Sequence, residues 1–198
     1  MLVAKTANQI MYIKKLMAMK KPIVVAAGPA GSGKTLFACQ VAAQKLAMNQ
    51  IEKIVVTRPT VSVDEDLGFL PGKLEKKMEP WVKPMFEIFE RERVQKYVEI
   101  VPMAYMRGRT FRNSFIIADE MQNSTPNQMK MILTRIGDDS KMVVTGDINQ
   151  SDLHIKLNGL GDLFQRLTFR DLEYIDSIVF TEEDIQRHPA IKEVLSIY

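Results

Sequence analysis

A glycine-rich run near the N-terminus has the residue types and spacing that bind phosphate. It matches G-x-x-x-x-G-K-[ST] at every fixed position and consists of Gly28, Pro29, Ala30, Gly31, Ser32, Gly33, Lys34 and Thr35. Glycines let the backbone turn tightly, so that its N–H groups approach an anion closely. We expect Lys34 to reach the β- and γ-phosphates of a nucleotide and the Thr35 hydroxyl to bind Mg²⁺. The alternative is a glycine-rich turn without a ligand.

Two adjacent acids follow a short apolar run and are the next candidates for chemistry. The run covers residues 115–118, and the acids are Asp119 and Glu120. Ligands of a parallel sheet bind at the carboxyl ends of its strands, where a phosphate loop also lies. We therefore expect Asp119 to hold Mg²⁺ and Glu120 to act as the general base that orients the attacking water. The alternative is a pair of solvated acids at the start of a helix.

Another apolar run, residues 142–144, is also followed by polar groups. The segment that follows begins with Thr145, Gly146 and Asp147 and ends at Gln150. A threonine, an aspartate or a glutamine at this place could reach the γ-phosphate or the water. The alternative is a simple turn that joins a strand to a helix.

Strands and helices alternate along the chain, which predicts an α/β fold with a mainly parallel sheet. Apolar runs predict strands at residues 23–27, 54–56, 98–101, 115–118 and 142–144. Helical periodicity predicts helices at 6–19, 34–47, 73–93, 126–136, 157–167 and 182–196. Glycines and prolines predict a loop at 59–72 and an interruption of the third helix near Pro80 and Pro84. Since no linker divides the chain, we expect one domain over residues 1–198.

Composition excludes several classes of protein. One cysteine among 198 residues rules out an intrachain disulfide framework and a four-cysteine zinc site, and two histidines rule out a histidine-rich metal site. No apolar run approaches the about 18 residues of a membrane span, and the first residues lack the apolar block of a secretory signal. We therefore expect a cytoplasmic protein. A net charge of +3 permits a polyanionic partner without requiring one.

The ordered motifs give the chain a specific resemblance to a known family. From about Asn8 onward it resembles the PhoH family of P-loop ATPases, which is related to the core lobe of superfamily 1 helicases. The matching segments are residues 28–35, 57–59, 67–72, 106–111, 119–123, 133–137, 145–150 and 187–189.

The resemblance implies a RecA-like sheet in which another strand lies between the phosphate-loop strand and the acid-pair strand. It also implies ATP hydrolysis, with Asp119 and Glu120 as the Walker B pair, and a contact between Gln150 and the γ-phosphate. Gln9, in an N-terminal helix within residues 1–20, resembles the glutamine that reads adenine in such helicases.

The family likeness further implies a head-to-tail homo-oligomer, which we expect to be a hexameric ring. In such a ring a neighbouring copy supplies an arginine finger, for which Arg187 is the first candidate and Arg109 the second. The alternative for Arg187 is a surface arginine that caps local carbonyls. Arg58, Arg107 and Arg109 are candidates for binding RNA or single-stranded nucleic acid, and the alternative is surface charge.

The function that these observations favour is Mg²⁺-dependent ATP hydrolysis coupled to unwinding or remodelling of RNA or single-stranded nucleic acid. A P-loop phosphotransferase such as a nucleotide kinase is one alternative, and a non-motor assembly protein that keeps ATP as a ligand is another. A GTPase switch is disfavoured because the chain has no Asn-Lys-x-Asp motif.

Overall fold

The computed structural model describes residues 3–59, 74–150 and 158–186, with the backbone alone for residues 74–81. Six strands of this part form one sheet, and all its neighbouring strands are parallel. In their order across the sheet, the strands are β3 (Val98–Ile100), β2 (Lys53–Thr57), β4 (Ser114–Ala118), β5 (Lys141–Gly146), β1 (Ile23–Ala27) and β6 (Ile175–Val179). The predicted α/β class is therefore confirmed. The loop predicted at 59–72 lies, apart from its first residue, outside the described residues.

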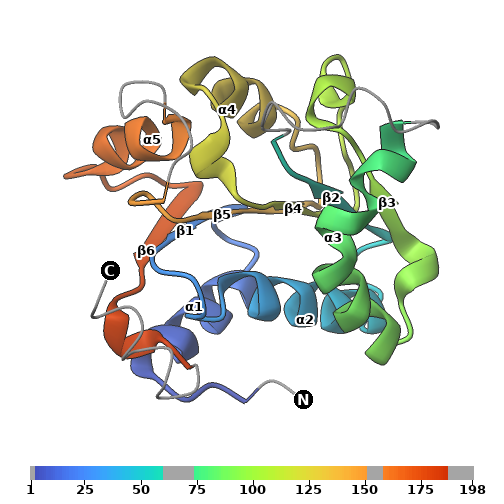
Figure 1. Cartoon of the computed structure of the whole chain (residues 1–198), viewed down its shortest axis with the longest axis horizontal. Coiled ribbons are helices and arrows are strands. Elements are labelled where there is room, and N and C mark those ends of the chain that lie inside the picture. The colour runs from blue at the N-terminus through green and yellow to red at the C-terminus, as the bar shows by residue number, and fades with distance from the viewer. Residues whose placement is uncertain (1–2, 60–73, 151–157, 187–198) are drawn as a thin grey trace.

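Helices cover both faces of the sheet, as Figure 1 shows with the sheet seen edge-on. One face packs against α1 (Ala7–Met17), α2 (Lys34–Ala47) and α3 (Leu74–Arg91). The other face packs against α4 (Pro126–Leu133) and α5 (Gly159–Leu167). The central strands β1, β4 and β5 are buried along their whole length, which explains why they are continuous apolar runs rather than alternating ones.

Strand β5 lies between β1 and β4, so the extra strand implied by the RecA-like resemblance is confirmed. The phosphate loop follows β1, the acid pair follows β4, and the polar segment Thr145 to Gln150 follows β5. Because the strands are parallel, all three sets of residues emerge at the same edge of the sheet.

Several predicted elements differ from the observed ones by one to three residues at an end, and two differ in kind. The third helix runs without a break from Leu74 to Arg91. Pro84 is exposed, while Val82, Met85 and Phe89 keep the helix packed on the core. At the C-terminal end, Glu182–Asp184 forms a 3₁₀ turn (η5) instead of the start of a helix, and the rest of the helix predicted at 182–196 lies outside the described residues.

Helix α1 is fixed at both ends. At its start, Thr6 and Asn8 donate hydrogen bonds to the Asp184 carboxylate. At its other end, the buried Lys141 Nζ donates to three backbone carbonyls, that of Lys15 in the last turn and those of Ala18 and Lys21 just after it. Burial lowers the pKa of Lys141 to about 8. No helix within the described part of the chain is long and apolar enough to cross a membrane.

Candidate nucleotide-binding and hydrolysis site

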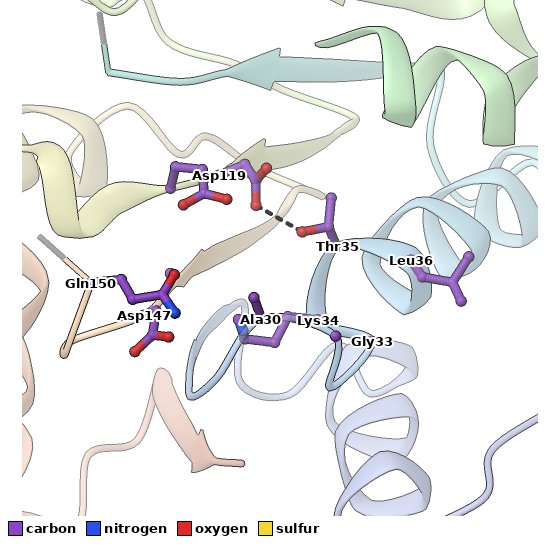
Figure 2. Close-up of a pocket in the computed structure, with 11 residues that line it drawn as sticks. Ala30, Gly33, Lys34, Thr35, Leu36, Asp119, Asp147 and Gln150 are labelled. Atoms are coloured by element: carbon purple, nitrogen blue, oxygen red, sulfur yellow. Dashed lines mark hydrogen bonds between the residues drawn. The ribbon is translucent and has the colours of Figure 1, made fainter. Parts of the chain in front are cut away.

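The three polar strand ends meet around one pocket of about 290 Å³ (Figure 2). Its lining comes from the phosphate loop, the first turn of α2, the acid pair and the segment after β5. The lining residues are Ala30, Gly31, Gly33, Lys34, Thr35, Leu36, Asp119, Glu120, Gly146, Asp147 and Gln150. The structure thus brings together most of the site residues that the sequence predicted.

The phosphate loop has a conformation that only glycine adopts easily. Gly28, Gly31 and Gly33 have φ angles of 143°, 88° and 94°. A Cβ atom on Gly28 would lie 2.6 Å from the Phe180 carbonyl oxygen, and one on Gly33 would lie 2.7 Å from the Phe37 ring. The glycines of the motif are therefore required by backbone conformation and by space, and they leave an open cradle of backbone N–H groups.

Lys34 folds back over this loop. Its Nζ donates to the carbonyl oxygens of Gly28 at 2.6 Å and Pro29 at 2.8 Å, and to the Ser32 Oγ at 3.3 Å. The ammonium group is buried in the cradle itself. A bound phosphate would offer it charged oxygens in the same place, which makes stronger hydrogen bonds than neutral carbonyls.

Asp119 lies at the centre of the site, with only 5% of its surface exposed. Its Oδ1 accepts a hydrogen bond from the Thr35 Oγ1, at 2.9 Å (Figure 2). The same oxygen accepts a second hydrogen bond from the Thr145 Oγ1. Burial raises the pKa of Asp119 above its ordinary value, and the Glu120 carboxylate adds to this, whereas the two hydroxyls and the Arg58 guanidinium oppose it. Thr35 and Asp119 present hard oxygen ligands side by side, so they fit Mg²⁺.

Glu120 is held in an unusual conformation beside Asp119. Its φ of 54° and ψ of 38° lie in the left-handed region, which is uncommon for any residue except glycine. The Gln122 Nε2 donates to the Glu120 Oε2 at 2.6 Å, and the Gln122 Oε1 accepts from the Asp147 backbone N–H at 3.1 Å. Gln122 was not predicted as a site residue, although it lies in the family-like segment 119–123.

Gln150 and Asp147 face the pocket from the turn after β5 (Figure 2). The backbone N–H of Gln150 donates to the Asp147 carbonyl at 3.2 Å, and the Asp147 carboxylate accepts from the Asn149 N–H at 3.0 Å. The Gln150 side chain is exposed at the mouth of the pocket that Lys34 also lines. Its contact with the γ-phosphate stays a prediction.

Gln9 lies behind the phosphate loop on α1. Its Nε2 donates to the Ser32 carbonyl at 3.0 Å and to the Asp184 carbonyl at 3.3 Å, and its Oε1 accepts from the Lys5 N–H at 2.8 Å. The amide therefore ties α1 to the loop and to the turn after β6. The adenine-reading role stays a prediction.

Arg109, one of the two candidate arginine fingers, is not among the described residues that line this pocket. Arg109 pairs with Glu99 at 2.7 Å and stacks on the Phe111 ring, with 4.6 Å between its Cζ and the ring centroid. This places it beside β3, at the far edge of the sheet from β1. Arg187 lies outside the described residues.

Comparisons with known proteins agree with the motifs. The family model described as PhoH-like protein matches residues 1–198. Relatives include a PhoH-like protein of Synechocystis (40% identical, covering 98% of this chain and 61% of the relative), one of Bacillus subtilis (39%, 98% and 63%) and the Protein PhoH of Escherichia coli (38%, 100% and 58%). The chain thus spans about three fifths of their length.

Among solved structures, the Pif1 helicase from Candida albicans aligns with 98% of this chain and 43% of its own, at 14% identity and a TM-score of 0.49.

Proposed function

The chain belongs to the PhoH-like protein family, and we propose that it hydrolyses ATP with Mg²⁺ and uses the reaction to remodel RNA or single-stranded nucleic acid. The part of this function that is already supported is a P-loop nucleotide-binding fold. The observation that carries the proposal is the convergence of Lys34, Asp119 and Glu120 on one pocket. A cation for the phosphates, a metal ligand and a base for water together are what hydrolysis requires.

The chain's own residues would act as follows. The N–H groups of the phosphate loop and Lys34 bind the β- and γ-phosphates, while Thr35 and Asp119 hold Mg²⁺. When bound, Mg²⁺ neutralises charge that develops on the phosphate oxygens. Glu120 accepts a hydrogen bond from the attacking water and orients it toward the γ-phosphate. Gln150 donates to the γ-phosphate from the opposite side of the pocket.

The test is steady-state ATP hydrolysis with and without Mg²⁺, RNA and single-stranded DNA. Glu120→Gln should still bind ATP yet lose about 10²-fold or more of its turnover, because the base is removed. Lys34→Ala should lose turnover and bind ATP weakly. Lys83→Ala and Glu87→Gln change exposed residues of α3 and should match the wild type. Wild-type turnover in a folded Lys34→Ala variant would refute the assignment, and transfer to a small acceptor would identify a kinase.

The nucleic-acid part of the proposal rests on the family and on two basic residues, one of which lies near the site. Arg58 lies close enough to Asp119 for its positive charge to lower the pKa of that carboxyl. Arg107 is exposed in the loop that follows β3. If these cations grip phosphates, affinity for RNA or single-stranded DNA should fall steeply with salt. Fluorescence anisotropy should show this, with Arg107→Ala compared against Arg170→Ala, an exposed arginine elsewhere. If neither RNA nor single-stranded DNA binds at low salt, the proposed nucleic-acid binding is refuted.

We also propose that the site is completed by another copy in a homo-oligomeric ring, with a hexamer expected. None of the described residues that line the pocket is an arginine, and a neighbouring copy could supply one to the γ-phosphate. Such a finger is worth about 10³–10⁵ in rate. Arg187→Ala and Glu120→Gln proteins should each be nearly inactive and should recover activity when mixed. A monomer by light scattering that hydrolyses ATP briskly would contradict a shared site.

A further inference from the structure

Gln122 connects the Glu120 carboxylate with the backbone of Asp147, which lies 25 positions further along the chain than Gln122. It belongs to a 3₁₀ turn, η3 (Met121–Asn123), and has only 3% of its surface exposed. Its amide nitrogen donates to the Glu120 carboxylate, and its amide oxygen accepts from the Asp147 backbone. One buried side chain therefore touches both the expected base and the turn that carries Gln150.

The orientation of this amide is fixed by its partners. The Asp147 N–H can only donate, so it must face the amide oxygen, and the NH₂ group must then face the Glu120 carboxylate. Space confines the side chain as well. A Cβ atom on Gly146 would collide with the Gln122 Oε1 and lie 2.7 Å from the Leu160 Cδ2. Gly146 thus leaves the space that the amide fills.

Glu120 needs such a partner. Its left-handed backbone stores strain, and its side chain is only partly buried. The bond from Gln122 engages Oε2 and leaves Oε1 for the attacking water. A base held in one direction spends more of its time in a productive geometry than one that rotates freely.

We propose that Gln122 is a positioning residue that aims the Glu120 carboxylate and couples it to the turn Gly146 to Gln150. This rests on the proposed ATP hydrolysis. The hydrogen-bonded path is continuous, because the Gln150 N–H donates to the carbonyl of Asp147, whose own N–H donates to Gln122. If the turn shifts when Gln150 binds the γ-phosphate, the Gln122 amide transmits the shift to the Glu120 carboxylate.

The first test is Gln122→Met, which keeps the length of the side chain and removes both hydrogen bonds. The kcat should fall about 10-fold or more, as part of the about 10²–10⁴-fold contribution of a general base is lost. The KM and the affinity for a fluorescent ATP analogue should stay within about threefold, since Gln122 is not among the residues lining the pocket. The matched control is Gln128→Met, which removes an exposed helix-capping bond to Thr125 and should leave kcat unchanged.

The second test is Gln122→Glu, which retains the acceptor for Asp147 but puts an oxygen where the donor faced Glu120. Its kcat should fall at least as far as that of Gln122→Met. A double-mutant comparison separates positioning from general loosening. In the Glu120→Gln background, Gln122→Met should cost less than about threefold, because the base it aims is already gone. A merely structural role predicts the same factor in both backgrounds.

The outcomes distinguish this inference from the function on which it rests. If the wild type hydrolyses ATP, Lys34→Ala does not, and both Gln122 variants turn over like the wild type, the positioning role is refuted and the ATPase stands. An equal loss in both backgrounds also refutes it. If the wild type hydrolyses no faster than Lys34→Ala, the ATPase proposal fails and the positioning role falls with it.

Discussion

Replacing Thr145 with valine tests how the site keeps a charged aspartate in its interior. Thr145 is fully buried in β5, and its hydroxyl donates to the Asp119 carboxylate. Valine has nearly the same shape and no donor. A hydrogen bond to a charged group is worth about 1.5–3 kcal/mol, and the added methyl group returns about 0.8 kcal/mol. We expect Thr145→Val to lose about 1–2 kcal/mol of unfolding free energy at neutral pH without metal.

The pH dependence of this loss has a definite sign. Burial raises the pKa of Asp119 above its unfolded value, so the folded protein binds the extra proton between the two values. The Asp119 contribution to the unfolding free energy therefore falls as pH rises through the folded pKa. Removing the Thr145 hydroxyl raises that pKa further. The gap between variant and wild type should widen from acidic to neutral pH and then become constant.

Urea unfolding with a chelator, from about pH 4.5 to 8, measures the gap, with Thr145→Ser as the control that keeps the hydroxyl. A gap that is equal at every pH, or a valine variant as stable as the wild type at pH 8, would refute the reasoning. Mg²⁺ needs the ionised carboxylate, so metal-dependent nucleotide binding should weaken in the valine variant as well.

Three further variants probe the support of the site. Lys141→Met leaves three carbonyls at and after the last turn of α1 without their donor, so urea unfolding should show a loss of about 2–4 kcal/mol, and unchanged stability would contradict this. Burial raises the pKa of Asp184, but its hydrogen bonds outweigh this and lower it below the ordinary value. The contribution of Asp184 to the unfolding free energy is thus present above the ordinary pKa and lost as pH falls through the folded pKa. Asp184→Asn should remove this loss from the acid unfolding curve, and an unaltered curve would contradict the role of Asp184. Gln9→Met should weaken fluorescent ATP and GTP analogues equally if Gln9 only braces the phosphate loop, whereas a loss confined to ATP would show adenine reading.

The fold was most predictable where the sequence has one dominant signal. Strand β1 and helix α2 have the predicted bounds, because an apolar run, a glycine motif and a helical pattern follow each other directly. Strand β6 was missed. Its centre contains Asp176 and Ser177, which break the apolar pattern, and only the tertiary structure supplies the Lys15 ammonium that pairs with Asp176 at 2.6 Å. An edge strand with a charged residue is hard to recognise without its partner.

Some residues of the site could likewise be predicted from the sequence and others could not. The phosphate loop and the acid pair were predictable because fixed spacing on one stretch of chain determines their geometry. Gln122 was not, since its role depends on a bond to Asp147 that only the packing of β4 beside β5 creates. The ion pair between Arg109 and Glu99 beside β3 was not predictable either, because charge in a loop does not say which carboxylate the fold will bring to it. The roles of Arg109 as a finger for a neighbouring copy and in binding nucleic acid stay predictions.

The nucleotide end of the sheet carries two features that cost stability, and helix α1 braces the phosphate loop beside them. Asp119 is a buried carboxylate, and Glu120 has a strained backbone. Helix α1 is tied down by side chains at its start and by Lys141 at its other end. Between these two anchors, Gln9 holds the Ser32 carbonyl. The rigidity of the phosphate loop therefore depends on a helix that contributes no residue to the pocket lining, so loosening either end of α1 reaches the loop through Gln9.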